Sequence, residues 1–306
     1  MSNEKRRGPP PDGFNPNGVL DNSWVTRKYL DIAYARESNA QKLDLYLPET
    51  GGGPFPTIVF IHGGAFMMCD KADNQVRPYL KKGLQLGYAV ASLNYRLSGE
   101  ALFPAGIKDV KAAIRFLRAN AAKYHLDGKK FIAAGGSSGA NYTCMICVTG
   151  NRPDLEDLSQ GNAEYSSAVQ GGVSWFAPTD FSKMDEQLTA NGLAQFADHN
   201  FVDSPESRYL GGQITTLPNE KVQAANPMTY VHPDMPPLFL QHGRKDHLVP
   251  WQQSALLAEK IVTVAGESKV RFEILENADH GDPLFETDEN MAKVFEFINR
   301  VLGGEA

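Results

Sequence analysis

The apolar positions of this chain alternate with polar ones near its start and then gather into nearly continuous runs. Residues 28–35 and 41–47 have the alternating spacing of half-buried strands, and only residues 36–40 separate them. We therefore expect an antiparallel pair of strands here. Residues 57–61 and 88–93 are almost wholly apolar, which is typical of strands that are buried on both faces of a sheet.

Helical spacing alternates with further strands along the rest of the chain. Residues 74–86 are long enough for a crossover helix, and residues 104–124 repeat apolar positions at three- and four-residue steps. Residues 291–302 show a similar amphipathic pattern and end at two glycines, which predicts a closing helix. Strands are expected at residues 130–134, 168–176, 237–241 and 270–275.

This order predicts the α/β fold class, with a mostly parallel central sheet, helices on both faces and the antiparallel N-terminal pair at one edge. Residues 1–20 are rich in proline, glycine and charge, and we expect an irregular lead-in. Residues 21–306 are interpreted as a single domain. Residues 180–235 break the alternation of helices and strands, and we expect an insertion over the carboxyl edge of the sheet.

Composition excludes several classes of protein. The 306 residues are 42% hydrophobic and 22% charged, which argues against disorder, and a net charge of −6 argues against a general nucleic-acid binder. No apolar run reaches about 18 residues, so we expect no membrane partner. Three cysteines suit a reducing compartment. The amino terminus lacks an apolar signal-peptide core, so we expect a cytoplasmic protein, whereas a chain trimmed of its signal peptide would be secreted.

A glycine-rich turn between a predicted strand and a predicted helix offers a nucleophile. Residues 135–139 read G-G-S-S-G, which fits the G-x-S-x-G pattern with Ser137 at its centre. Such a sharp turn lifts the serine hydroxyl above the sheet and places it at a helix N-terminus, where negative charge is favoured. Phosphate-binding turns are also glycine-rich, but this one lacks the Lys-Ser/Thr of a P-loop and the third glycine of a dinucleotide fingerprint.

A second glycine-containing loop offers donors for an oxyanion. Residues 62–66 read H-G-G-A-F directly after a predicted strand and resemble the H-G-G-G type of oxyanion loop. We assign an oxyanion hole to the backbone amides of Gly64, Ala65 and Ser138. His62 is interpreted as a brace for the loop, because no cluster of metal-ligand residues surrounds it in the sequence.

A serine nucleophile needs a base, and the base needs a carboxylate that orients it. His280 follows the last predicted strand, and Asp246 follows the strand before it, so both are expected at the same sheet edge as Ser137. Asp279 and Asp282 compete for the role of the acid, but a carboxylate next to a histidine in sequence rarely faces its Nδ1. Two further histidines are expected to be surface or bracing residues: His242 and His247.

The combined motifs identify a family resemblance that covers about residue 28 to the C-terminus. They are H-G-G-A-F at 62–66, N-Y-R-L-S at 94–98, F-P-A at 103–105 with Asp109, H-G-x-x-D-x-x-V-P at 242–250, H-G-D-P at 280–283, S-P-E-S at 204–207 and A-N-P at 225–227. The chain resembles the α/β-hydrolase superfamily. Within it the chain is similar to the bacterial carbohydrate-esterase branch, which is related to feruloyl esterases, acetylxylan esterases and hormone-sensitive-lipase-like enzymes.

The resemblance implies an α/β-hydrolase fold and hydrolysis of short-acyl or aromatic-acyl esters, often on plant cell-wall sugars, with no cofactor and no metal. Three small residues depart from the branch's usual pattern around the nucleophile: Gly136, Ser138 and Ala140. They leave room for the turn and bear on the acyl pocket and oxyanion geometry. Three aromatic residues are expected to line the substrate site: Phe66, Trp175 and Phe176.

We therefore expect a serine carboxylesterase that removes small acyl groups, above all acetyl groups, from xylan-type oligosaccharides. The expected partner is a small-molecule or oligosaccharide ester, and the sequence does not define an oligomeric state. A feruloyl or cinnamoyl esterase is one alternative. A serine aminopeptidase or formamidase would use the same three residues, and a non-catalytic hydrolase-fold binding module is an alternative from another class.

Overall fold

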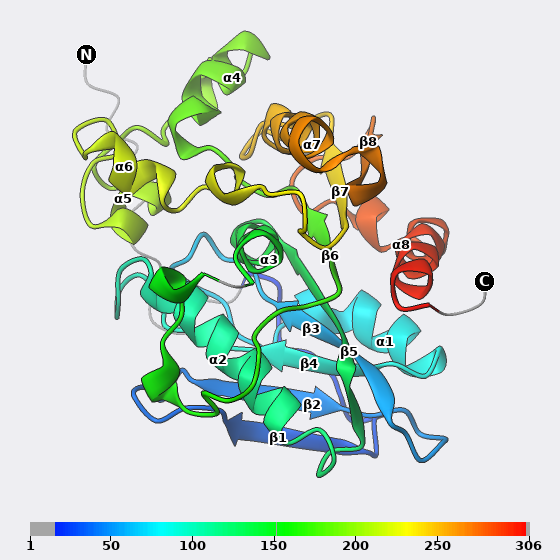
Figure 1. Ribbon diagram of the computed structural model, residues 1–306. Helices are drawn as coiled ribbons and strands as arrows, with labels where there is room; N and C mark the ends of the chain where they lie inside the picture. The colour runs from blue at the N-terminus through cyan, green and yellow to red at the C-terminus, as the bar shows by residue number, and fades with distance from the viewer. Residues whose placement is uncertain (1–15, 151, 304–306) are drawn as a thin grey trace.

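One eight-stranded sheet organises the molecule, with the strand order β1-β2-β4-β3-β5-β6-β7-β8 (Figure 1). The strands are β1 (Lys28–Ala33), β2 (Lys42–Tyr46), β3 (Phe55–Ile61), β4 (Ala89–Leu93), β5 (Leu126–Gly136), β6 (Gly171–Trp175), β7 (Leu238–Gly243) and β8 (Val270–Leu275). Strand β2 is antiparallel to both β1 and β4, and every other neighbouring pair is parallel. The predicted fold class and the antiparallel edge pair are confirmed. This computed structural model describes residues 16–150 and 152–303, so most of the predicted lead-in lies outside the described residues.

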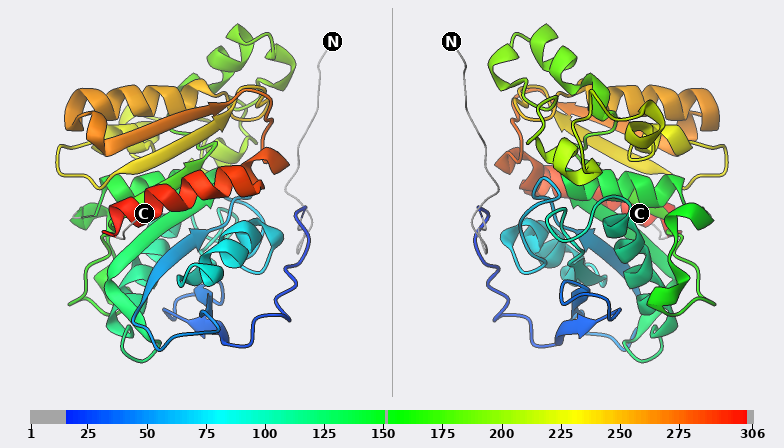
Figure 2. Two further views of the ribbon diagram at one scale, coloured as in Figure 1. Left: turned by 90° about the vertical axis from the view of Figure 1, so that its right-hand side faces the viewer. Right: turned by 90° about the vertical axis from the view of Figure 1, so that its left-hand side faces the viewer.

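Helices cover both faces of the sheet. They are α1 (Arg77–Gln85), α2 (Ala105–Ala119), α3 (Ser138–Val148), α4 (Met184–Ala190), α5 (Pro205–Leu210), α6 (Asn219–Gln223), α7 (Gln252–Ala265) and α8 (Asp288–Val301). Short 3₁₀ turns occur at Asn74–Val76, Pro153–Leu155, Leu158–Gln160, Phe181–Lys183, Ala194–Phe196, Pro227–Tyr230, Glu267–Lys269 and Pro283–Glu286. Helices α1 and α8 lie on one face, and α2 and α3 lie on the other (Figure 2).

The central strands are apolar throughout because each of their faces packs into a different core. In β3, Val59 and Ile61 join the core beneath α2, α3 and α7, whereas Ile58 and Phe60 join the core beneath α1 and α8. Successive side chains of a strand point to opposite faces, so a strand between two helical layers needs no polar positions. Each fully buried aliphatic side chain of this kind contributes roughly 1.5–3 kcal/mol to folding.

The structure differs from the sequence prediction in two helices. Helix α7 was not predicted, because it buries the polar residues Gln253 and Ser254 while the apolar Val262 is exposed, so its apolar residues do not gather on one face. Helix α2 ends at Ala119, five residues before the predicted end, and a turn follows that leads into β5. The side chain of Asn120 hydrogen-bonds back to the carbonyl oxygen of Phe116, at 2.9 Å, where the helix ends.

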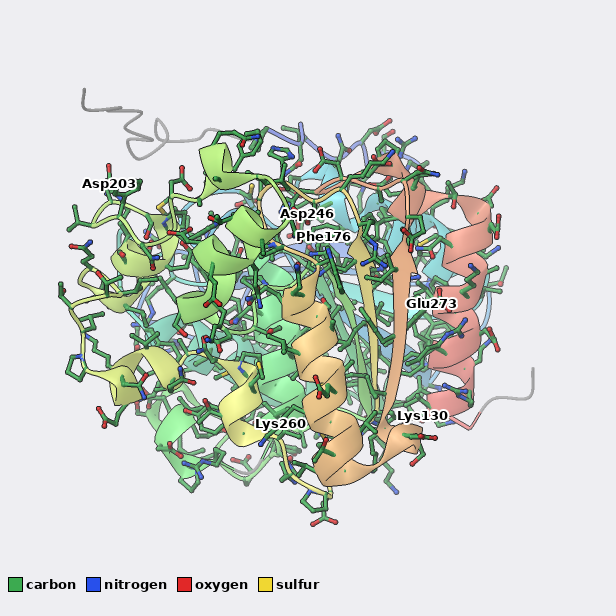
Figure 3. All side chains as sticks on the ribbon, turned by 90° about the horizontal axis from the view of Figure 1, so that it is seen from above. Lys130, Phe176, Asp203, Asp246, Lys260 and Glu273 are labelled. Atoms are coloured by element: carbon green, nitrogen blue, oxygen red, sulfur yellow. The ribbon has the colours of Figure 1, made fainter. Side chains whose placement is uncertain are left out.

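The segment between β6 and β7 contains α4, α5 and α6 (Figure 1). Seen from above, these helices lie to one side of the strand ends, with Asp203 at their outer border (Figure 3). Phe176 and Asp246 lie together near the middle of the same view, close to the carboxyl ends of β6 and β7. The carboxyl edge of the sheet is therefore where segments distant in sequence meet.

The close contact between α3 and β3 allows a test of the packing. A Cβ atom added at Gly139, in the first turn of α3, would lie 2.6 Å from the carbonyl oxygen of His62 and closer still to that of Ile61. Because both contacts are with backbone, Gly139→Ala should lower the free energy of unfolding by about 1–3 kcal/mol or more. Urea unfolding measures this, with Gly99→Ala as the control because its added Cβ meets nothing within 4 Å. Equal losses in both variants would contradict the packing argument.

Candidate active site

Ser137 occupies a strained turn between β5 and α3. Its backbone angles are φ 55° and ψ −124°, and its amide donates a hydrogen bond of 2.9 Å to the carbonyl oxygen of Trp175 at the end of β6. A non-glycine residue in such a conformation costs on the order of 1–3 kcal/mol, and the surrounding structure must hold it there. The short strand-to-helix connection and the bond to β6 provide that restraint. The turn leaves the side chain of Ser137 at the wall of a cavity.

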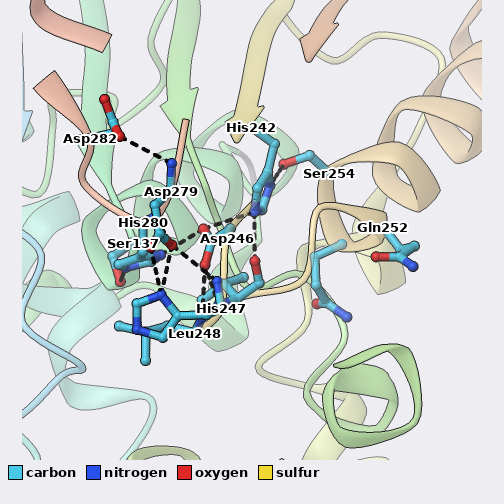
Figure 4. Close-up of polar contacts among 12 residues, drawn as sticks. Ser137, His242, Asp246, His247, Leu248, Gln252, Ser254, Asp279, His280 and Asp282 are labelled. Carbon is cyan, nitrogen blue, oxygen red and sulfur yellow. Dashed lines mark hydrogen bonds and ion pairs between the residues drawn. The ribbon is translucent and has the colours of Figure 1, made fainter. Parts of the chain in front are cut away.

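The structure brings Ser137, His280 and Asp246 together across three different strand ends (Figure 4). His280 follows β8, and its Nε2 lies 3.1 Å from Oγ of Ser137. On the other side of the ring, Nδ1 lies 2.8 Å from Oδ2 of Asp246, which follows β7. In the tautomer that donates from Nδ1 to the carboxylate, Nε2 presents a lone pair to the serine hydroxyl.

Asp246 is fully buried, and hydrogen-bond donors surround its carboxylate. The amides of Leu248 and Val249 donate to Oδ1 at 2.9 and 2.8 Å, and Nε2 of His242 lies 3.3 Å from Oδ2. Burial alone would raise the pKa of Asp246. The charge of His280 and the hydrogen bonds from His242 and His280 outweigh burial and hold this pKa well below its usual range. The group is therefore a carboxylate at neutral pH.

The other histidines of this region are braces. His242 is buried, with Nδ1 2.7 Å from Oγ of Ser254 and Nε2 2.8 Å from the carbonyl oxygen of Val249. His247 pairs through Nδ1 with Oδ1 of Asp279, at 2.7 Å. Both histidines are therefore bracing residues, which was one of the two roles expected for them. His242 is not a surface residue.

Asp279 connects the two loops that carry Asp246 and His280. Its Oδ1 accepts the amide of His280 at 2.7 Å and the amide of His247 at 3.2 Å, in addition to the side-chain contact with His247. Asp282 in turn accepts the amide of Asp279 at 3.3 Å. The two carboxylates that competed with Asp246 in the sequence thus hold the histidine loop in place, whereas Nδ1 of His280 faces Asp246.

The loop after β3 folds tightly beside Ser137. Gly64 and Ala65 have φ values of 115° and 55°, and the carbonyl oxygen of Gly64 accepts the amides of residues 67 and 68. Gly64 and Ala65 line the cavity, while Ser138 begins α3, where helix amides have no intrahelical partner. Two of the predicted oxyanion donors, Gly64 and Ala65, therefore lie on the loop after β3, and the third, Ser138, is the first residue of α3, directly after Ser137.

Gln75 holds the loop after β3, although sequence reasoning did not single it out. Its Oε1 accepts the amide of Gly63 at 2.8 Å, and its Nε2 donates to Oδ2 of the buried Asp73 at 2.9 Å. His62 is buried as well, and its ring stacks on Tyr95 at 4.5 Å. Burial lowers the pKa of His62, which suits a neutral bracing residue. A glutamine in a crossover segment belongs to no motif, so only the fold reveals its role.

The cavity beside Ser137 has a volume of about 410 Å³. Trp175 and Phe176 are in its wall, and the centroid of the Phe176 ring lies 4.6 Å from that of the His280 ring. The prediction for Phe66 was wrong: it is not among the cavity residues and stacks on Tyr209, with ring centroids 4.0 Å apart. A left-handed backbone, φ 62°, accompanies this placement in an aromatic cluster. Polar residues also line the cavity, including Asn74, Gln75, Arg77 and Glu286.

Within residues 16–150 and 152–303, no group of three or more His, Cys, Asp or Glu side chains is arranged to hold a metal ion. No helix in that part of the chain is both long and apolar enough to cross a membrane. Cys144 and Cys147 are buried in α3 as unpaired thiols.

The sheet order and the turn at Ser137 define an α/β-hydrolase. A family model described as BD-FAE matches residues 43–261, and the chain belongs to that family. Esterase LipQ of Mycobacterium tuberculosis is 30% identical over 259 residues, which are 84% of this chain and 58% of LipQ. Esterase LipC of the same organism is 27% identical over 252 residues, with 81% of this chain and 59% of LipC covered. The chain thus spans less than two thirds of the length of these curated relatives.

Solved structures show the same fold. A bifunctional GH43-CE protein of Bacteroides eggerthii superposes with a TM-score of 0.80 at 31% identity, covering 90% of this chain and 35% of that protein. A truncated carbohydrate esterase from gut microbiota superposes with a TM-score of 0.79 at 27% identity, covering 94% of this chain and all of that structure.

The ionised state of Asp246 predicts a pH-dependent loss of stability. Asp246→Asn should lower the free energy of unfolding by about 3 kcal/mol at pH 7, because it removes the charge from a buried pair. The pKa of Asp246 is lower in the folded protein, so its stabilisation is present above the unfolded carboxyl value of about 3.9 and is lost as the pH falls through the folded value. The difference between wild type and variant should therefore shrink from pH 7 to pH 3.

Urea unfolding at both pH values measures that difference. Asp234→Asn serves as the control, because Asp234 is exposed. A deficit of the same size at pH 3 and pH 7 for Asp246→Asn would contradict the assignment of a buried carboxylate.

Proposed function

We propose that the protein is a serine carboxylesterase in which Ser137 is the nucleophile, His280 the base and Asp246 the orienting acid. The supporting observation is the continuous chain of contacts from Oγ of Ser137 through both nitrogens of His280 to a buried carboxylate. At its Ser137 end, this series of contacts meets a cavity that is large enough for a small ester. The relatives that carry the name esterase support the same reaction class.

In the proposed mechanism, Nε2 of His280 takes the hydroxyl proton as Oγ of Ser137 forms a bond to the ester carbonyl carbon. The carbonyl electron pair moves to oxygen and gives a tetrahedral oxyanion. The amides of Gly64, Ala65 and Ser138 would donate to this oxyanion, and the loss of one such donor typically costs about 3–4 kcal/mol of transition-state stabilisation. Collapse breaks the bond to the alcohol oxygen, which leaves with the proton from His280.

Water completes the proposed cycle. His280 takes a proton from the water molecule, whose oxygen attacks the acyl carbon, and the second tetrahedral intermediate releases the acid and the serine hydroxyl. Asp246 stays ionised and stabilises the imidazolium of His280 in both halves of the reaction. The donor-rich surroundings of its carboxylate suit this role, because they keep its negative charge in a buried site.

For the substrate, we propose acetyl groups on xylan-type carbohydrate. The ring of Phe176 lies against the nucleophile turn, where a Cβ added to Gly136 would be 3.0 Å from it, and this favours a small acyl group beside Ser137. Polar side chains of the wall, among them Asn74 and Arg77, suit the hydroxyl groups of a sugar. The similar carbohydrate-esterase structures also support a sugar as the alcohol part of the ester. A feruloyl ester is the competing substrate, because Trp175 adds a second aromatic wall.

Removal of the Ser137 hydroxyl tests the reaction class. Ser137→Ala should lower kcat on p-nitrophenyl acetate by about 10⁶-fold and abolish labelling by a fluorophosphonate, because the attacking oxygen is gone. Ser268→Ala, at an exposed serine, is the matched control and should keep both properties. Hydrolysis at an unchanged rate in Ser137→Ala would refute the proposed nucleophile.

A competition assay tests the substrate class. The wild-type protein is incubated with equal concentrations of acetylated xylo-oligosaccharide and methyl ferulate, and released acetate and ferulate are measured together. We expect acetate in excess. An excess of ferulate would replace the acetyl proposal with a feruloyl esterase while leaving the proposed nucleophile intact.

A further inference from the structure

A buried histidine of the segment between β6 and β7 reaches the loop that carries Asp246. His199 is 8% exposed and precedes α5. Its Nδ1 lies 3.0 Å from Oε2 of Glu206 on α5, and its Nε2 lies 2.9 Å from the carbonyl oxygen of Leu248. Neither His199 nor Glu206 is among the cavity residues, so the pair meets the Asp246 loop from outside the cavity.

Leu248 transmits this contact to the carboxylate. Its amide donates to Oδ1 of Asp246 at 2.9 Å, and its side chain lines the cavity. Val249 has an analogous arrangement: its amide donates to the same oxygen, and its carbonyl oxygen lies 2.8 Å from Nε2 of His242. Two buried histidines therefore hold the carbonyl groups of the two residues whose amides hold Asp246.

The partners of the two histidines differ in what they require. Nδ1 of His242 faces the hydroxyl of Ser254, which can donate, so a neutral ring with its proton on Nε2 satisfies the contact with Ser254 and the contacts of Nε2 with Val249 and Asp246. Both nitrogens of His199 face acceptors, a carboxylate and a carbonyl oxygen, and only an imidazolium carries two N–H donors. With Glu206 as a carboxylate, the contact with Leu248 and the contact with Glu206 can both be hydrogen bonds only while His199 is charged.

The charges around His199 favour that state. Burial alone would lower the pKa of His199, but the negative charge and hydrogen bond of Glu206 outweigh burial and raise the pKa to about 9. Asp185 on α4 adds to the effect, and its two carboxylate oxygens accept the amides of His199 and Asn200, each at 2.9 Å. The imidazolium therefore persists through neutral pH and is lost at alkaline pH.

We propose that charged His199 is a positioning residue that ties the segment between β6 and β7 to the Asp246 loop and keeps Asp246 aligned with His280. The inference rests on the proposed esterase function and adds to it a role for residues outside the cavity. Deprotonation removes one donor from the pair of contacts, so Leu248 is released or Glu206 loses its partner. Misalignment of Asp246 then weakens orientation of His280 in the transition state and lowers kcat with little effect on KM.

The alkaline limb of the pH profile is the decisive measurement. We would measure kcat and KM for p-nitrophenyl acetate from pH 6 to pH 10.5, with subtraction of the spontaneous hydrolysis. Wild-type kcat should fall as the pH rises through about 9. In Glu206→Gln the carboxylate charge is gone, so the pKa of His199 falls and the limb should move down by about one pH unit or more. A limb at the same pH in both proteins would overturn the proposal.

A second variant removes titration from this position. His199→Gln keeps one amide donor but cannot change charge, so its alkaline limb should disappear and its kcat at pH 7 should fall by about 10- to 100-fold. His232→Gln, at another histidine of the same segment, should retain the wild-type profile. Wild-type kcat and limb in His199→Gln would overturn the proposal. If His199→Gln does not fold, the pH of the alkaline limb in Glu206→Gln decides whether the proposal holds.

The outcomes also separate this inference from the proposed function. A wild-type protein that hydrolyses the ester and is labelled at Ser137, but whose limb does not respond to Glu206→Gln, leaves the esterase intact and removes the role of His199. A wild-type protein that neither hydrolyses the ester nor reacts with a fluorophosphonate overturns both.

Discussion

The buried negative charge of Asp246 is the interaction on which the candidate site depends. Removing a carboxylate from water costs several kcal/mol unless donors replace its hydration. Two backbone amides and two imidazole rings do so here. The amides of Leu248 and Val249 require the loop after β7 to turn back on Asp246, and the ring of His280 comes from the separate loop after β8. A Cβ atom at Gly243 would collide with the carbonyl oxygen of Ala278, which shows how closely the end of β7 approaches the histidine loop. The end of β7 and the loop that carries His280 are therefore packed directly against each other.

The parallel sheet makes this convergence possible. Strands β3, β5, β6, β7 and β8 are neighbours in space and run in the same direction, so the loops at their carboxyl ends lie along one edge. Ser137 and His280 are 143 positions apart in sequence, yet their side chains are in hydrogen-bond contact. Each loop supplies one part of the candidate site: the proposed oxyanion amides of Gly64 and Ala65 after β3, the serine after β5, an aromatic wall after β6, the carboxylate after β7 and the histidine after β8.

The sequence was sufficient to predict those residues of the candidate site that belong to a motif and also follow a predicted strand. Ser137, Asp246 and His280 each follow a predicted strand, so their proximity follows from the topology once the sheet is recognised. Phe66 shows the limit: its place in the loop was clear, but the direction of its ring depends on an aromatic cluster assembled from distant segments. Gln75 and His199 act through contacts with backbone groups of other loops, and such contacts leave no spacing in the sequence.

Phe176 links the shape of the cavity to the geometry of the candidate base. Its ring occupies the space that a side chain at position 136 would need, and the same ring lies 4.6 Å from His280 and 4.8 Å from Phe285. Its backbone adopts φ 46°, directly beside the bond between the amide of Ser137 and the carbonyl oxygen of Trp175. A larger residue at Gly136 would place its Cβ 3.0 Å from this ring, so the ring that packs against His280 would have to shift. Gly136 is therefore coupled to Phe176, and a change of size at position 136 would also change the surroundings of His280.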